Sequence, residues 1–243
     1  YLGKRYSNNE ARDELKKNGV KFKRLSKHDL IHETVLALCD GQAIGWFQGR
    51  SEFGPRALGS RSILADPRNP DMQSTLNLKI KFRESFRPFA PVILVEESEN
   101  WFEILRDSPY MMFVDKLNEN KKIDQPNKNL VSRDIKSQLA VKRSIVPAIT
   151  HVDHSARVQT ISKSQNPLLH ELLSVFHKRT GCPILVNTSF NVRGEPIVET
   201  PLDAIKCFFG TDLDALALGN HFVKKMDNSG YINENYKRQF IRD

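Results

Sequence analysis

Hydrophobic residues recur along the chain with two spacings, one typical of helices and one typical of buried strands. Helical spacing places Leu30, Ile31 and Val35 on one face of a segment that begins at Ser26. Short apolar runs bounded by turn residues separate such segments and predict strands. The strands are expected at 21–25, 43–47, 89–95, 111–114, 157–160, 183–186, 213–218 and 222–224.

The expected helices have recognisable starts. Ser7 with Glu10 has the pattern of a capping box, and a proline follows Asn166 and Thr200 at two further starts. Because strands alternate with helices and no internal repeat is visible, the sequence predicts an α/β fold with a mostly parallel or mixed sheet. The helices are expected at 8–18, 26–41, 69–80, 97–105, 166–181 and 200–209.

Composition agrees with a globular domain. The chain has 243 residues, of which 39% are hydrophobic and 27% charged, so it can bury a sizeable core. No apolar run approaches the ~20 residues that span a bilayer, and no secretory signal is visible. We expect Cys39, Cys182 and Cys207 to be structural thiols in a reducing cytoplasm, because their spacing fits no metal site. Since Tyr1 is not an initiator methionine, we expect the chain to begin inside a longer gene product.

A net charge of +8 favours an anionic partner, and the cations are unevenly placed. Eight of them lie between positions 45 and 90, interleaved with glycine, proline and phenylalanine. Arginine offers a rigid fork of donors to phosphate or carboxylate oxygens, and lysine offers a compact charge. This segment therefore predicts a pocket for a small polyanion. Its cations are Arg50, Arg56, Arg61, Arg68, Lys79, Lys81, Arg83 and Arg87.

Two motifs in this segment suit such a pocket. GPRALG, at 54–59, follows an expected strand and forms a tight loop in which backbone N–H groups can approach a phosphate. It is no Walker A loop, and the alternative is a structural turn with Arg56 on the surface. KFRESFRPF, at 81–89, joins a helix to a buried strand and brings Lys81 and Arg87 to a sheet edge. Its alternative is a solvated run of charges.

Further candidates lie outside this segment. Asn187 and Ser189 follow the buried run CPILV and can orient a phosphate or an acyl oxygen, with a polar turn as the alternative. Arg157 opens a short expected strand. His151 and His154 are three residues apart, but no third strong ligand is near them in the sequence. We therefore predict no metal held by this chain.

Four segments together resemble a known family. GWFQGRSEFGPRALGSRSILADPR, KFRESFRPFAPVIL, THVDHSARVQT and CPILVNTSFNVRGEPIV, the last followed by TPLDAI, resemble the C-terminal region of the O-carbamoyltransferases. That family includes nodulation and antibiotic-tailoring enzymes. The resemblance runs from 1 to 225 and departs mainly at 118–144, a polar stretch that we expect to be a long mobile excursion.

The resemblance implies a YrdC-like fold, a twisted mixed sheet flanked by helices. Residues 1–25 would connect it to an N-terminal domain that is missing here. Residues 26–226 would be the YrdC-like domain that forms carbamoyl-adenylate, and 227–243 a loose tail. The missing domain would have the actin-like superfold and carry iron or a similar metal.

In function, the resemblance implies that the chain binds ATP and carbamoyl phosphate, forms carbamoyl-adenylate and releases pyrophosphate. Mg²⁺ would be held by the nucleotide, and the N-terminal domain would pass the carbamoyl group to a substrate hydroxyl. Lys81, Arg87 and Ser189 would be catalytic. The family's substrate- and ATP-binding positions fall on Arg56, Lys81, Arg87, Arg157, Asn187 and Ser189.

Two other functions remain open from the residues. One is threonylcarbamoyl-adenylate synthesis for tRNA modification, whose enzymes are less similar in the GPRALG and NTSFN motifs. The other is a basic RNA-binding module, although no pattern of stacking aromatic residues is present. We expect no membrane or nucleic-acid partner. The sequence leaves open a homodimer and the identity of the carbamoyl acceptor.

Overall fold

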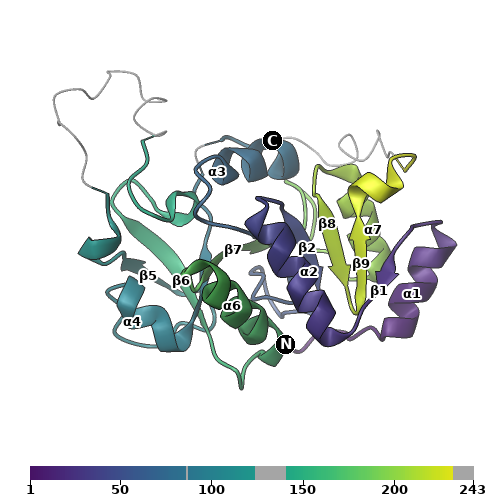
Figure 1. Ribbon diagram of the computed structural model, residues 1–243, viewed down its shortest axis with the longest axis horizontal. Coiled ribbons are helices and arrows are strands. Elements are labelled where there is room, and N and C mark those ends of the chain that lie inside the picture. Colours follow the sequence, from purple (N-terminus) through teal and green to yellow (C-terminus); the bar gives the residue numbers. More distant parts are fainter. Residues whose placement is uncertain (86, 124–140, 232–243) are drawn as a thin grey trace.

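The computed structural model of the protein describes residues 1–85, 87–123 and 141–231. Within these ranges, nine strands form one mixed sheet in the order β1-β9-β8-β2-β3-β7-β4-β6-β5 (Figure 1). The strands are β1 (Lys23–Arg24), β2 (Ile44–Phe47), β3 (Arg61–Ala65), β4 (Pro91–Leu94), β5 (Phe113–Lys116), β6 (Ser155–Ile161), β7 (Ile184–Ser189), β8 (Ala215–Leu218) and β9 (His221–Lys224).

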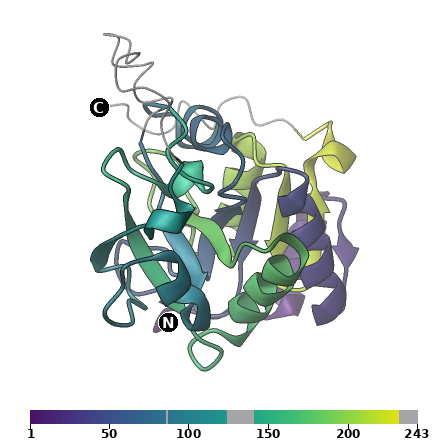
Figure 2. The ribbon, with the colours of Figure 1, turned by 60° about the vertical axis from the view of Figure 1, so that its left-hand side comes forward.

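Helices cover both faces of this sheet. α2 and α6 pack together on one face, and α7 packs against β2 and β8 from the other, with α1 beside it (Figures 1 and 2). The helices are α1 (Asn8–Lys17), α2 (Lys27–Cys39), α3 (Met72–Thr75), α4 (Ser98–Trp101), α6 (Pro167–Thr180) and α7 (Pro201–Gly210). Shorter turns are the π-helix η1 (Leu76–Lys81) and the 3₁₀-helices η2 (Val95–Glu97), η3 (Glu119–Lys121), η5 (Pro147–Ile149) and η6 (Lys225–Asn228).

The helix starts follow the sequence. The Ser7 and Glu10 side chains form the predicted capping box of α1, and Thr200 with Asp203 forms another at α7. Asn166 caps α6, and Gly181 ends that helix with a left-handed φ of 72°. Capping residues satisfy backbone N–H groups that would otherwise lack a partner, so these boundaries could be predicted locally.

The α/β prediction with a mixed sheet is confirmed, but the sheet is not mostly parallel. Among the described strands, only β2 with β8 and β4 with β6 are parallel pairs. β7 lies between β3 and β4 and is antiparallel to both. Its first half pairs with β4 and its second half with β3, so β7 joins the two halves of the sheet.

Three local predictions were wrong. β3, at Arg61–Ala65, was expected to be loop, because its arginine and the turn residues before it hid a strand that is entirely buried. The helix expected at 97–105 ends at Trp101, and Phe102 is already extended. The expected loop residues Asn187 and Ser189 belong to β7, which continues past the apolar run.

The first 25 residues are joined to the sheet. β1 pairs antiparallel with β9, and α1 packs against α7. The predicted boundary between residues 25 and 26 stays a prediction, as does the boundary at 226. The excursion at 118–144 and the tail at 227–243 fall largely outside the described residues. The two described ends of the excursion pair at Lys122 and Ser144.

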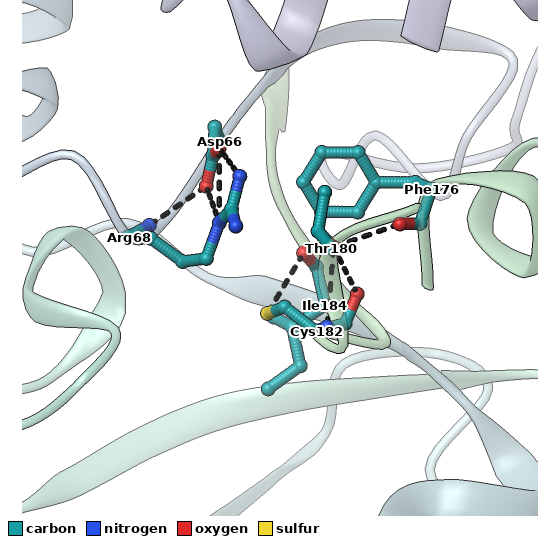
Figure 3. A network of polar contacts seen from close by, with 6 residues as sticks. All are labelled: Asp66, Arg68, Phe176, Thr180, Cys182 and Ile184. Atoms are coloured by element: carbon teal, nitrogen blue, oxygen red, sulfur yellow. Dashed lines mark hydrogen bonds and ion pairs between the residues drawn. The ribbon is translucent and has the colours of Figure 1, made fainter. Parts of the chain in front are cut away.

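A partly buried ion pair between Asp66 and Arg68 lies at the sheet edge where β3 ends and β7 begins (Figure 3). The carboxylate of Asp66 is 4% exposed and accepts from Arg68 Nε at 2.9 Å and Nη2 at 2.5 Å. Nearby, Thr180 Oγ1 accepts from the Cys182 N–H at 3.1 Å. Burial raises the pKa of Cys182 to about 12, so this thiol stays protonated at neutral pH. No disulfide joins the three cysteines.

No helix of the described residues is both long enough and apolar enough to cross a lipid bilayer.

We predict that Gly45→Ala lowers the free energy of unfolding by about 1–3 kcal/mol in urea denaturation. A Cβ atom at Gly45, in the middle of β2, would lie 2.7 Å from Phe190 Cζ and 3.1 Å from Leu216 Cδ1. Phe190 follows β7 directly, so its displacement would also shift the end of that strand. Gly230→Ala is the matched control, because a Cβ atom there meets nothing within 4 Å. Equal stability of both variants would contradict the packing argument.

Candidate functional site

Strand ends from both halves of the sheet meet at one edge, which we call the site edge. β2, β7 and β8 end there, and β3, β4 and β6 begin there, since β3 is antiparallel to both β2 and β7. The predicted motifs join these ends. The loop 48–60 connects β2 to β3, the segment 82–90 precedes β4, and the segment 190–200 follows β7. Topology therefore brings distant parts of the sequence to one edge.

The ammonium group of Lys81 is buried at the end of β7. Its side chain comes from the last turn of η1, and the residue is 4% exposed. Nζ donates to the Ser189 carbonyl, to Ser189 Oγ at 3.2 Å, and to Asn191 O and Oδ1 at 2.9 and 2.8 Å. Ser189 Oγ in turn donates to Asn191 Oδ1 at 2.6 Å. The structure thus joins two of the predicted catalytic residues, Lys81 and Ser189.

Burial changes the acidity of this lysine. The pKa of Lys81 is lowered to about 7, mainly by removal from water, with the nearby charge of Arg83 acting in the same direction. The oxygen acceptors around Nζ favour the ammonium form. Lys81 therefore changes charge near neutral pH, where an anionic ligand would favour the protonated form.

Asn77 organises the segment that follows Lys81. This side chain is fully buried, and its Nδ2 donates to Ser85 O at 3.0 Å and to Arg87 O at 2.8 Å. Its Oδ1 accepts from Arg83 Nε at 2.6 Å. Phe82 makes the turn in the left-handed region, with φ 50°, which is uncommon for a phenylalanine and often marks functional sites.

Asn187 and Gln159 hold the GPRALG loop against the sheet. Asn187 Nδ2 donates to Gln159 Oε1 at 2.6 Å and to the Ala57 carbonyl at 3.1 Å. Gln159 Nε2 donates to the Leu58 carbonyl at 2.9 Å. The Asn187 Oδ1 atom is buried and has no hydrogen-bond partner among the described residues, so its capacity to accept is unused.

Arg56 and Arg157 lie within electrostatic reach of each other. Burial lowers the pKa of Arg157, and the positive charge of Arg56 lowers it further. Arg56 is exposed, whereas the Nε atom of Arg157 is buried and finds no hydrogen-bond partner within the described part of the chain. Two like charges placed together, with an unpaired donor between strand and loop, suit an anion.

Arg87 stands apart from Lys81. Its Nε lies 3.4 Å from Glu84 Oε2, and Arg193 Nη1 lies 3.9 Å from Glu84 Oε1. Among the described residues, Arg87 makes no hydrogen bond or ion pair to Lys81 or Ser189. The charge of Arg87 nevertheless helps to lower the pKa of Arg83 to about 10, after burial. Arg83, Arg87 and Arg193 thus form a cationic cluster around one carboxylate.

Several residues of this site escaped the sequence analysis. Asn77, Gln159 and Asn191 are amides whose roles depend on partners far away in the sequence, such as the contact of Gln159 with Leu58. The signal available for Asn191 was its place in the same polar run as Ser189. Arg193 was visible in the same loop. Asn77 gave no signal, because it lies within an expected amphipathic helix.

The two histidines lie in the turn that precedes β6. His151 Nδ1 lies 3.1 Å from Asp153 Oδ1, while His154 adopts a left-handed φ of 63°. Across the part of the chain that the structure describes, no three His, Cys, Asp or Glu side chains gather in a group suited to a metal ion.

These features define an α/β domain with a cationic, amide-lined site at one edge of its sheet. The chain belongs to the family described as Carbamoyltransferase C-terminus, whose family model matches residues 35–225. That range contains all six predicted site residues, and the predicted family is confirmed.

Curated relatives agree with this membership. An uncharacterized protein of Synechocystis sp., sll1178, is 49% identical over 93% of this chain. Nodulation protein NolO of Bradyrhizobium diazoefficiens is 45% identical over 81% of it. The 3'-hydroxymethylcephem-O-carbamoyltransferase of Streptomyces clavuligerus is 34% identical over 79%. The chain spans 37%, 33% and 32% of the lengths of these three relatives.

Among solved structures, full-length HypF in its phosphate- and nucleotide-bound form aligns with a TM-score of 0.46 and 15% identity. The alignment covers 73% of this chain and 19% of HypF. A likeness this distant carries no argument about the site.

We predict that stability depends on pH through Lys81. Its pKa is about 7 in the folded protein and near 10.5 when unfolded, so the unfolded chain binds more protons between these values. The free energy of unfolding therefore rises with pH, by about 2 kcal/mol from pH 7 to pH 9 for this group alone. Urea denaturation should show this rise in the parent and in Lys79→Gln, an exposed neighbour, but not in Lys81→Gln. The same rise in Lys81→Gln would contradict the assignment.

We predict that Asn77→Ala loosens the segment 82–88. The substitution leaves the Ser85 and Arg87 carbonyls and the Arg83 guanidinium group, all partly buried in these contacts, without this partner, which costs up to about 1–3 kcal/mol per group that stays unsatisfied. Hydrogen exchange of the Arg83 and Arg87 amides should accelerate at least tenfold. Asn100→Ala is the control, because Asn100 is exposed and bonds only to Glu97. Unchanged hydrogen-exchange protection of these amides in Asn77→Ala would show that Asn77 does not organise the segment.

Proposed function

We propose that this chain is the adenylate-forming part of a carbamoyltransferase, which binds ATP and carbamoyl phosphate at the site edge. The observation that carries the proposal is the buried ammonium group of Lys81 at the end of β7, on the same edge of the sheet as two groups of arginines. Arg56 and Arg157 form one group, and Arg83, Arg87 and Arg193 form the other. Family membership and the relatives named for carbamoyl transfer support the same chemistry.

The arrangement suits a triphosphate. Phosphate oxygens accept from guanidinium and ammonium groups, and fixed cations stabilise charge that grows in a transition state without having to reorganise. Asn187 and Ser189 lie on the same face of β7, two residues apart, so both can orient a small carbonyl or phosphoryl group beside the cations. Arg87 would reach the phosphates from the segment that Asn77 holds.

In the proposed reaction, water cleaves carbamoyl phosphate into carbamate and phosphate. A carbamate oxygen then attacks the α-phosphorus of ATP, and the bond to the bridging oxygen breaks. Pyrophosphate leaves with the electron pair of that bond, and carbamoyl-adenylate remains. Lys81 and Arg87 would stabilise the negative charge on the phosphoryl oxygens, and Ser189 would position the carbamoyl group.

Mg²⁺ would accompany the nucleotide in this proposal. The described site residues are cations, amides and a hydroxyl, a set that fits phosphates better than a metal ion. Phosphate oxygens and water would therefore supply most ligands of Mg²⁺. The chain spans about a third of its curated relatives, so transfer to a hydroxyl acceptor would belong to an N-terminal domain of the longer protein, with its iron or similar metal.

An ATP–pyrophosphate exchange assay tests the proposal. We predict exchange of labelled pyrophosphate into ATP that requires carbamoyl phosphate. Arg87→Ala and Lys81→Ala should lower the exchange rate at least a hundredfold. Each substitution removes a positive charge that would stabilise the negative charge developing on the phosphoryl oxygens. Lys79→Ala, two residues before Lys81 and exposed, should retain it. Arg87 is also exposed, so loss of folding would not explain its effect, and circular dichroism checks this.

Other outcomes identify other functions. Exchange that needs threonine and bicarbonate would replace the proposal by threonylcarbamoyl-adenylate synthesis. Absence of exchange, together with salt-sensitive RNA binding, would replace it by an RNA-binding module. Full exchange in both Lys81→Ala and Arg87→Ala would be consistent with the proposed reaction but would show that neither residue takes part in it.

A further inference from the structure

A hollow lies at the site edge, on the side of β1, β8 and β2. Its volume is about 1330 Å³, and its walls are the starts of α1, α2 and α6 and the turns after β2 and β8. None of the six predicted site residues lines it. The loop 57–59 lies between the hollow and the predicted site residues. Tyr1 Oη donates to the Leu58 carbonyl at 2.7 Å, and Gln159 donates to the same carbonyl from the sheet.

The lining of the hollow is cationic. Arg5, Arg24, Lys27 and Arg50 contribute positive charges, and Glu10 is the one carboxylate among the described lining residues. Glu10 is occupied at the start of α1, where its Oε2 accepts from the Ser7 N–H at 2.7 Å and from Ser7 Oγ at 2.8 Å. The negative charge of Glu10 therefore interacts with the positive end of the α1 dipole and does little to neutralise the arginines that line the hollow.

Two of these cations make no side-chain contact with the described residues that would hold them in place. Lys27 pairs with Glu171, and Arg50 Nη1 donates to the Gly3 carbonyl at 3.1 Å. Within the described ranges, the guanidinium groups of Arg5 and Arg24 make no hydrogen bond or ion pair. Both residues are exposed to solvent at the mouth of the hollow. They are therefore available to a ligand without loss of a structural contact.

The start of α6 adds to the positive electrostatic potential in the hollow. Asn166, Pro167 and Leu168 line the hollow, and the first turn of this 14-residue helix carries no acidic residue. Asn166 Nδ2 lies 3.4 Å from Tyr1 Oη, another residue that lines the hollow. The positive end of this helix dipole and the lining cations therefore both favour an anion in the hollow.

The rest of the lining suits an organic molecule rather than a bare ion. Tyr1, Tyr6 and Phe47 supply aromatic surface, and the Tyr6 and Phe47 rings pack with centroids 6.0 Å apart. Gln48 is held rigidly, because its Nε2 donates to Ala217 O and Gly219 O at 3.2 and 2.9 Å. The volume exceeds the roughly 300–1,000 Å³ of most small-molecule sites, so a sugar phosphate or a nucleotide would fit.

We propose that this hollow binds a small organic phosphate, whose phosphate group Arg5 and Arg24 hold. Aromatic rings and fixed amides would contact the remainder of the molecule. The inference does not rest on the proposed adenylate chemistry, because the two sites have no residue in common.

Nuclear magnetic resonance of the ¹⁵N-labelled 243-residue chain tests the inference. The probes are ribose 5-phosphate and inorganic pyrophosphate, with uncharged ribose as the control. We expect the amide signals of Gly49, Leu168 and Asn220 to shift with both anions. Signals of Lys81 and Ser189 report separately on the other site, so binding there is distinguished from binding in the hollow.

Paired variants separate a specific site from general attraction. Arg5→Gln with Arg24→Gln should weaken binding in the hollow at least tenfold. Lys178→Gln with Lys206→Gln removes the same charge from exposed positions outside the hollow and should change the dissociation constant less than about twofold. Circular dichroism confirms folding of both variants. Absence of shifts at the three amides with both anions, or an unchanged dissociation constant in the arginine variant, would overturn the proposal.

Discussion

The buried ammonium group of Lys81 constrains the whole site. A charge removed from water costs several kcal/mol unless polar groups surround it, so the end of β7 must supply oxygen acceptors. Ser189 and Asn191 meet this requirement and thereby fix the turn after β7 to the end of η1. Asn77, one helical turn before Lys81, fixes the following segment. Two loops far apart in sequence thus take their positions from one helix end.

The fold could be predicted where local chemistry decides it. Capping residues and apolar spacing placed α1, α2, α6 and α7, and apolar runs placed the buried strands. β3 was missed because Arg61 is fully buried in it. Its Nη1 donates to the Gln48 and Ser60 carbonyls, and its guanidinium group lies 3.6 Å from the Phe47 ring centroid. Backbone oxygens and an aromatic ring make an arginine acceptable in a buried strand, and neither is visible in a local pattern.

The candidate site was predictable in its charges but not in its framework. Cations within turn-rich sequence indicated a polyanion site, and the family resemblance selected six of the residues. Their distances from one another depend on amides such as Asn77 and Gln159, whose partners are set by tertiary packing. Asn187 shows the difference well. The sequence marked it as a ligand group, yet its amide nitrogen also holds the GPRALG loop against the sheet.

Cations that looked alike in the sequence differ in how their charge is compensated. Arg61 is held by backbone carbonyls, and Arg68 by Asp66 at the opposite end of β3. The charge of Arg56 acts on Arg157 instead, and burial followed by the charge of Arg87 lowers the pKa of Arg83. Like charges held together raise the free energy of the folded protein until an anion binds. A ligand that relieves this repulsion binds the folded state alone, so occupancy of the site edge and stability of the domain are thermodynamically linked.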